Sequence, residues 1–130
     1  MVTKLSHVVL YVDDQDKALT FYRDILGLKV HTDADYEGMR WLTLHPFLQP
    51  DFELVIMKAS SPEGKELVGK QSPEAPLFVF NTLDCKSDYA LFKEKGVNFV
   101  EEPTQHFWGL QALCLDVFGN MISILELPKN

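Results

Sequence analysis

The sequence contains an internal repeat, and this repeat constrains the fold more strongly than any single motif. When the chain is shifted against itself by 70 residues, with one-residue adjustments in the middle, four blocks align. The aligned blocks are 7–22 with 77–92, 27–30 with 96–99, 40–45 with 111–116, and 53–57 with 123–127. A repeat of this length predicts two copies of one supersecondary unit.

Each copy has the pattern strand, helix, strand, strand, strand. The apolar, β-branched run 5–12 predicts a buried strand, and Asp13 or Asp14 then offers an N-cap for a helix that Gly27 ends. Further strands are expected near 28–33, 39–45 and 53–58. In the second copy we expect a strand at 77–82, a helix at 84–95 ended by Gly96, and strands near 97–101, 110–116 and 121–127. The sequence therefore predicts an α+β fold with two βαβββ modules.

Composition indicates a globular protein and excludes some classes of binding partner. The chain has 130 residues, 46% of them hydrophobic, which predicts one domain over 1–130, with modules at 5–58 and 77–127 joined by a linker at 59–76. The formal net charge of −7 argues against nucleic acid and anionic membranes as partners and is compatible with a cationic ligand. We find no membrane-length apolar stretch and no signal-peptide cleavage site, so a cytoplasmic location is expected.

Strand alternation predicts which side chains face a shared concave surface. Residues such as Leu10 and Leu44 are expected to pack under the helices, and their neighbours point the other way. The predicted concave face comprises His7, Tyr11, Trp41, Thr43, Glu53, Val55, Met57, Leu77, Asn81, Ala112, Cys114, Ser123 and Leu125. A surface that is mainly apolar and aromatic with few polar groups is typical of a small-molecule pocket.

Several of these residues are candidates for ligand contact or catalysis. Glu53 is a candidate general base if its carboxylate points into the cavity, and a solvated rim residue if it does not. His7 is either a polar contact and possible metal ligand or a core histidine. Trp108, in the aromatic loop 101–109, is a candidate for stacking on a ligand. His106 in the same loop is expected to face solvent, and the pocket mouth is the alternative. His31 is expected at the surface. Both cysteines are expected to be reduced packing residues.

Three segments resemble the vicinal oxygen chelate superfamily, which includes glyoxalase I, bleomycin-resistance proteins and extradiol dioxygenases. They are SHVVLYVDDQDKALTFYRDILGLKV (6–30), DCKSDYALFKEKGVNFVEEP (84–103) and WGLQALCLDVFGNMISILEL (108–127). The resemblance implies that the curved mixed sheets of the two modules form an open, barrel-like cavity. It also implies a homodimer.

The resemblance assigns four metal-ligand positions to this chain, of which only two carry ligating side chains. The positions are His7, Glu53, Leu77 and Ser123. Glu126 is excluded as a substitute, because it follows the glycine of the DVFGN turn by seven residues instead of four and strand parity places it on the opposite face from Ser123.

The first prediction is therefore a metal-independent protein that binds a small amphipathic or aromatic molecule through Tyr11, Trp41, Met57, Trp108 and the other concave-face residues. The alternative is a glyoxalase-like lyase or isomerase, or a dioxygenase, in which His7 and Glu53 hold a divalent metal (Zn, Ni, Mn or Fe) or Glu53 moves a proton alpha to a carbonyl.

Overall fold

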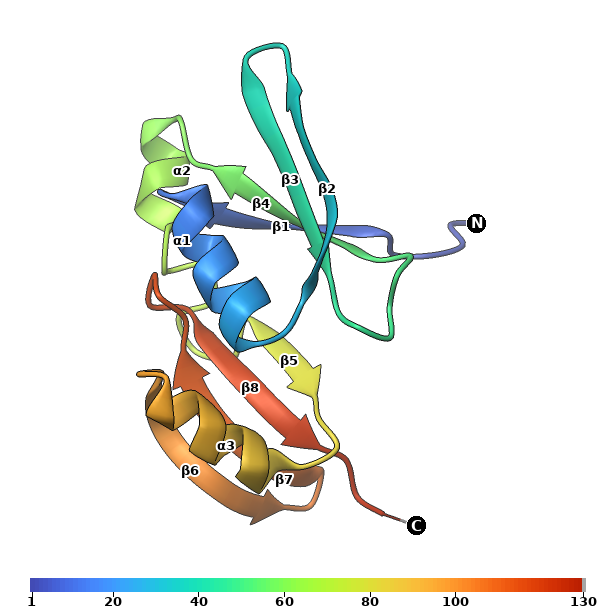
Figure 1. Ribbon diagram of the computed structural model, residues 1–130, viewed down its shortest axis with the longest axis vertical. Coiled ribbons are helices and arrows are strands. Elements are labelled where there is room, and N and C mark those ends of the chain that lie inside the picture. The colour runs from blue at the N-terminus through green and yellow to red at the C-terminus, as the bar shows by residue number, and fades with distance from the viewer. Residues whose placement is uncertain (130) are drawn as a thin grey trace. The chain divides into compact units, whose positions relative to one another are not determined.

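The computed structural model describes residues 1–129 and divides the chain into two compact units, Met1–Val68 and the part from Gly69 onward (Figure 1). The first unit contains β1 (His7–Val12), α1 (Gln15–Leu19), the π-helix η1 (Thr20–Ile25), β2 (Lys29–Tyr36), β3 (Met39–His45), β4 (Glu53–Lys58) and α2 (Pro62–Leu67). The second contains β5 (Phe78–Asn81), α3 (Cys85–Glu94), β6 (Asn98–His106), β7 (Gly109–Leu115) and β8 (Met121–Glu126). No helix in the described part of the chain is long and apolar enough to cross a membrane.

Both units contain a four-stranded mixed sheet with the same topology. The strand orders are β1-β4-β3-β2 and β5-β8-β7-β6, and in each sheet the first strand runs parallel to the last strand of its unit. All the other neighbours are antiparallel. The α+β fold of two βαβββ units that the repeat predicts is thus confirmed, with curved sheets.

The helices begin and end where the sequence signals place them. The carboxylate of Asp14 accepts a hydrogen bond from the backbone N–H of Lys17 at 3.0 Å, and Asp84 accepts one from Ser87 at 3.0 Å. Gly27 and Gly96 follow the helices with φ of 87° and 92°, which an L side chain rarely adopts. The first helix widens from α to π geometry halfway along, a change that the sequence pattern did not indicate.

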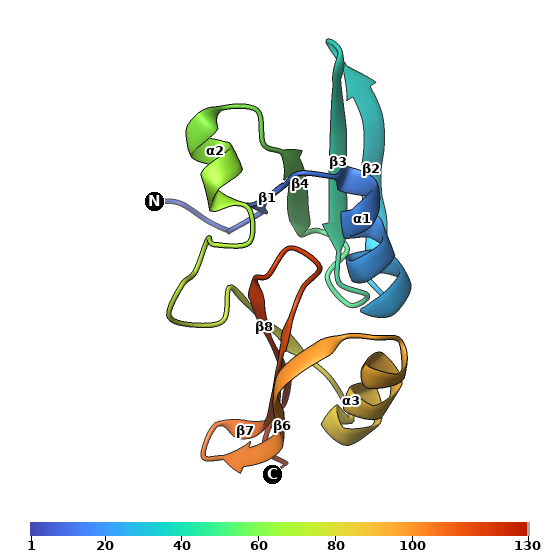
Figure 2. The same cartoon turned by 90° about the vertical axis from the view of Figure 1, so that its left-hand side faces the viewer.

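In each unit a helix lies against one face of the sheet (Figure 2), and the apolar core is buried between them. In the first unit the sheet contributes six residues that are at most 2% exposed: Leu10, Val12, Leu42, Leu44, Leu54 and Ile56. In the second unit the corresponding buried residues are Ala112, Cys114, Ile122 and Ile124, which pack with Cys85 of α3. Burying these apolar side chains supplies the main driving force for folding each unit.

One prediction about the second sheet is wrong. Cys114 lies opposite Ile122, and Ala112 lies opposite Ile124, so both point toward α3 and not into the concave face. Leu113 is paired with Ser123 and takes the concave side instead. The repeat alignment used an odd offset of 71 residues for this strand, whereas the pairs Thr43–Val55 and Leu113–Ser123 require an even one, and an odd error in register moves every side chain to the other face.

The segment expected to be a linker contains a helix. The hydroxyl of Ser61 accepts a hydrogen bond from the N–H of Gly64 at 3.0 Å, and Pro62 occupies the first helical turn. Serine at the N-cap followed by proline is a strong helix-start signal, so this helix could have been predicted from the sequence.

Candidate functional site

The centre of the candidate site is a contact between His7 and Glu53. The two residues face each other across the parallel ladder of β1 and β4, so strand register fixes their proximity. Nε2 of His7 lies 2.6 Å from Oε2 of Glu53, and Nδ1 of His7 lies 2.7 Å from the hydroxyl of Ser6. Both ring nitrogens therefore have protein partners.

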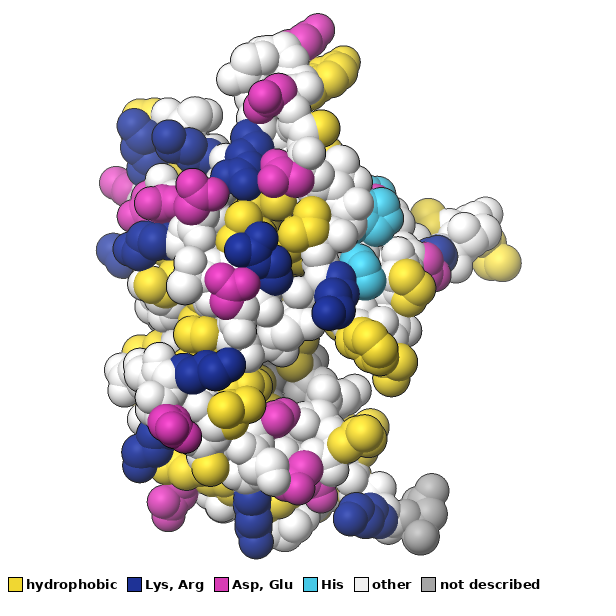
Figure 3. Space-filling view, viewed as in Figure 1, with side chains coloured by type: hydrophobic (Ala, Val, Ile, Leu, Met, Phe, Trp, Pro, Cys, Tyr) yellow, Lys and Arg dark blue, Asp and Glu magenta, His cyan; other side chains and the backbone are white. Residues whose placement is uncertain are grey.

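The second carboxylate oxygen of Glu53 is also engaged. The hydroxyl of Thr43, which is fully buried on β3, donates to Oε1 at 2.9 Å, and Nδ1 of His31 lies 3.2 Å from the same oxygen. The Glu53 side chain is 17% exposed, so it is neither a solvated rim residue nor fully enclosed. We call His7, His31, Thr43 and Glu53 the histidine–carboxylate cluster. Figure 3 shows histidine side chains reaching the surface of the first unit.

The sequence predicted His7, Thr43 and Glu53 on one face but placed His31 at the surface, away from any site. The ladder between β2 and β3 shifts between Val30 and Thr32, so His31 lies in a β-bulge. Bulges redirect a side chain in a way that alternation does not anticipate.

The second unit has a different polar network at the corresponding face. The hydroxyl of Ser123 donates to Oε1 of Gln111 at 2.9 Å, and Nε2 of Gln111 donates to Glu101 at 3.3 Å. The other Glu101 oxygen lies 2.9 Å from Nε2 of His106. The sequence identified Ser123 but not Gln111 or Glu101, because the odd register error had turned Gln111 away from this face.

Trp108 covers one end of that network. Its indole ring stacks on the imidazole of His106, with ring centres 4.3 Å apart and planes 4° apart, and its Nε1 lies 3.4 Å from Oε1 of Gln111. Trp108 is nevertheless 41% exposed. An aromatic ring that is fixed on one face and accessible elsewhere is suited to stacking on a planar ligand.

The residues present do not complete the metal site that the family uses. In the second unit Leu77 lies next to Met121, with its N–H donating to the Met121 carbonyl at 2.8 Å, and Ser123 follows two residues later. Across the described residues, no group of three or more His, Cys, Asp or Glu side chains is arranged to hold a metal ion. A catalytic zinc site has three protein ligands, and the side chains of Leu77 and Ser123 do not supply the missing ones.

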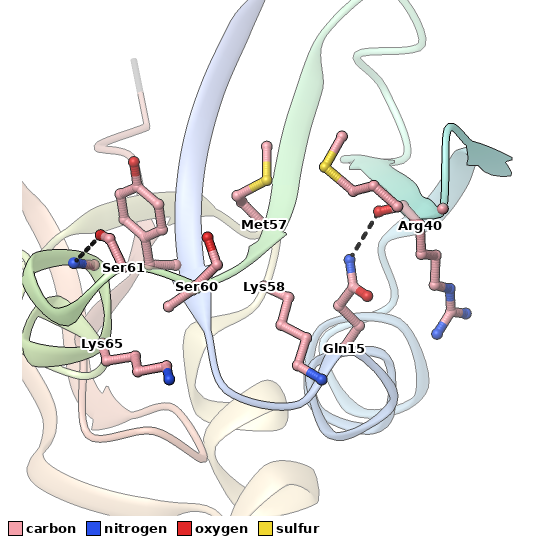
Figure 4. A pocket seen from close by; sticks show the side chains of 12 residues that line it. Gln15, Arg40, Met57, Lys58, Ser60, Ser61 and Lys65 are labelled. Carbon is pink, nitrogen blue, oxygen red and sulfur yellow. Dashed lines mark hydrogen bonds between the residues drawn. The ribbon is translucent and has the colours of Figure 1, made fainter.

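Three predicted contact residues lie elsewhere on the first sheet. Tyr11 and Met57 face each other across β1 and β4, and Trp41 lies on the same face of β3. Tyr11 and Met57 also line a pocket of about 790 Å³ at the end of these strands (Figure 4).

Cys114 and Glu126 face the helix and therefore lie outside the candidate site. Cys114 is buried on the helix side, where desolvation, with Asp116 nearby, raises the pKa of its thiol to about 12. A thiol with such a pKa is not a nucleophile near neutral pH. Glu126 accepts a hydrogen bond from the N–H of Cys85 at 2.9 Å, at the start of α3, and so faces the helix as parity predicted.

Comparisons with known proteins support the same family. The model of the Glyoxalase/Bleomycin resistance protein/Dioxygenase superfamily matches residues 4–124. The uncharacterized protein YurT of Bacillus subtilis is 36% identical over 125 residues, which cover 95% of this chain and 98% of YurT.

Solved structures share the fold over nearly the whole chain. The crystal structure of UcmS2 has a TM-score of 0.84 and 32% identity, covering 97% of this chain and 99% of UcmS2. TnmS3, an antibiotic binding protein from Streptomyces sp. CB03234, has a TM-score of 0.77 and 26% identity, covering 98% of both chains. Fold, repeat and sequence agree, and the chain belongs to the glyoxalase/bleomycin resistance protein/dioxygenase superfamily.

Proposed function

We propose that this protein binds a small amphipathic or aromatic molecule without using a metal. The observation that carries the proposal is the environment of Glu53, whose two oxygens meet His7, Thr43 and His31 within the protein. The equivalent part of the second unit offers Leu77 and Ser123, which cannot complete a metal site. A carboxylate held in this way orients a polar group of a ligand and needs no ion to hold it in place.

Each unit separately has residues that suit an aromatic body on a ligand. Trp41, Tyr11 and Met57 extend the face that carries Glu53, and Trp108 offers the stacked, partly exposed indole of the second unit. Ser123 supplies a buried hydroxyl in that unit. The net charge of −7 favours a ligand with positive charge. The similarity to TnmS3, which is described as an antibiotic binding protein, supports the same class of activity.

One observation favours a second candidate, proton transfer by Glu53. The His7 imidazole lies 2.6 Å from the Glu53 carboxylate, and a carboxylate next to an imidazole is a common arrangement in general acid–base catalysis. In this alternative Glu53 would take a proton alpha to a carbonyl, and the bound molecule would be converted and not simply held.

The test measures ligand binding in the absence of metal, with tryptophan fluorescence as the readout. The protein is dialysed against EDTA and titrated with bleomycin, an amphipathic cation, and with naphthalene-1-carboxamide, a neutral aromatic. Trp41 and Trp108 are the only tryptophans, so Trp41→Phe and Trp108→Phe each leave one reporter. We expect saturable quenching in the absence of metal, and about three- to tenfold weaker binding in Glu53→Gln because a charge-assisted contact is lost.

Elemental analysis of the purified protein can contradict the proposal. Stoichiometric Zn, Ni, Mn or Fe that disappears in His7→Ala would show a metal site and end the proposal, as would the absence of saturable binding by either probe. Recovery of the bound probe or of carbonyl analogues chemically changed, with the change abolished in Glu53→Gln, would favour the proton-transfer alternative.

A further inference from the structure

The two units differ in how far their third and fourth strands stay together. In the second unit β7 and β8 pair continuously over six positions, from Leu110–Glu126 to Leu115–Met121. In the first unit β3 and β4 pair over only three positions, the last being Leu42 with Ile56. Beyond that pair the strands separate, and we call the opening between Met39–Arg40 and Met57–Lys58 the fork.

Gln15 satisfies the backbone of the fork while it stays open. Its side-chain Nε2 donates to the carbonyl of Arg40 at 3.1 Å (Figure 4) and to the carbonyl of Ile56 at 2.9 Å, one on each strand. Carbonyls that lose their ladder partners need other donors when they are partly buried. The fork is therefore a stabilised feature of the first unit and not a frayed strand end.

The pocket of about 790 Å³ lies in this fork. Its volume is within the range of small-molecule sites. Tyr11, Met39 and Met57 contribute apolar surface to this pocket, and Lys58, Ser60 and Lys65 contribute polar groups. Figure 4 shows Lys65 of α2 across the pocket from Gln15 and Arg40, with Lys58 and Ser60 between them.

The positive charge of this pocket comes from the two lysines. Arg40 is already neutralised, since its guanidinium meets Asp33 at 2.9 Å and Asp16 at 2.8 Å. Among the described residues, neither Lys58 nor Lys65 has a carboxylate within 4.0 Å. Figure 3 shows basic side chains gathered over the α2 edge of the first unit, with acidic ones among them.

We infer that the fork is a second ligand site, which takes a small acidic molecule with an apolar body, such as an aromatic carboxylate. Its carboxylate would meet Lys58, Lys65 and the Ser60 hydroxyl, and its ring would lie on Tyr11, Met39 and Met57. The fork shares Tyr11 and Met57 with the face used in the proposed function, but its charged contacts are separate from that function. His7 is four residues from Tyr11 along β1, a separation of about 13 Å in a strand, so the fork does not include the histidine–carboxylate cluster.

The experiment compares two probes that differ only in charge. Naphthalene-1-carboxylate and naphthalene-1-carboxamide are titrated into ¹⁵N-labelled protein, and amide shifts are followed by NMR. We expect the carboxylate to shift the amides of Lys58, Ser60 and Lys65, and to bind about three- to tenfold more weakly to Lys58→Gln/Lys65→Gln. Carboxamide binding should be unaffected by this double change.

The matched control is Lys86→Gln/Lys95→Gln, which makes the same change in net charge at exposed positions of the second unit. It should bind the carboxylate like the unmodified protein. The inference is overturned if the carboxylate fails to bind saturably, if it shifts amides away from the fork, or if both double variants weaken it equally. Weakening by Glu53→Gln, with the lysine variant unaffected, would assign the acid to the histidine–carboxylate cluster instead and would leave the proposed function standing.

Discussion

At the scale of single residues, the site depends on which side of a strand a polar group lies. Glu53 and Ser123 are on the concave faces and have hydrogen-bonding partners there. Cys114 is one strand away from Ser123 but belongs to the opposite face, where it is fully buried. The face of the strand on which a polar group lies therefore decides whether the group is accessible for reaction.

The placement of Cys114 predicts its reactivity. Burial raises the pKa of its thiol to about 12 and raises that of Cys85 as well, so both thiols hold their protons in the folded protein. In the Cys85→Ala variant we expect Cys114 to react with dithionitrobenzoate at pH 8 only after unfolding in guanidinium. Because an unfolded thiol ionises near 9.0, stability should fall as the pH rises from there toward 12. Rapid labelling of the native variant would contradict the buried placement.

At the scale of secondary-structure elements, Gln15 at the start of α1 joins two separated strands through its side-chain amide. Gln15→Glu keeps the size of the side chain but removes its donors and places a carboxylate against two carbonyl oxygens. We expect a loss of about 1–3 kcal/mol in the free energy of unfolding, measured with urea, and faster hydrogen exchange beside the fork. Gln49→Glu makes the same charge change at an exposed loop position and should have little effect. Equal stability of the two variants would show that the bridge contributes nothing.

The elements were largely predictable because the repeat gave two readings of the same pattern. Strands β3 and β4 match their predicted ranges, and both helix starts follow from Asp14 and Asp84. What failed was register. An offset wrong by one residue reversed the face of Cys114, and the bulge at His31 brought into the site a side chain that alternation had left outside. Both depend on how strands pair in space, which a single strand's sequence does not specify.

At the scale of the whole molecule, the two units share one fold but differ in the polar groups on their concave faces and in their strand pairing. The first has the histidine–carboxylate cluster and an open fork, and the second has the Gln111 network and a continuous ladder. The helix side of each sheet is apolar in both units, whereas the polar groups that distinguish the units lie on the concave side.

The remaining prediction concerns assembly. Val9 and Val79 occupy equivalent positions on β1 and β5, the edge strands of their sheets, and are 38% and 55% exposed. Exposed apolar side chains on edge strands favour association. We therefore expect a homodimer, with a mass in light scattering of twice the 14.9 kDa of one chain. Val9→Glu and Val79→Glu should shift the protein toward monomer, because each would desolvate a charge at the interface. Val117→Glu, at a valine of similar exposure in the turn between β7 and β8, should leave the mass unchanged. A monomer at all protein concentrations would contradict the prediction, as would a dimer that none of these changes affects.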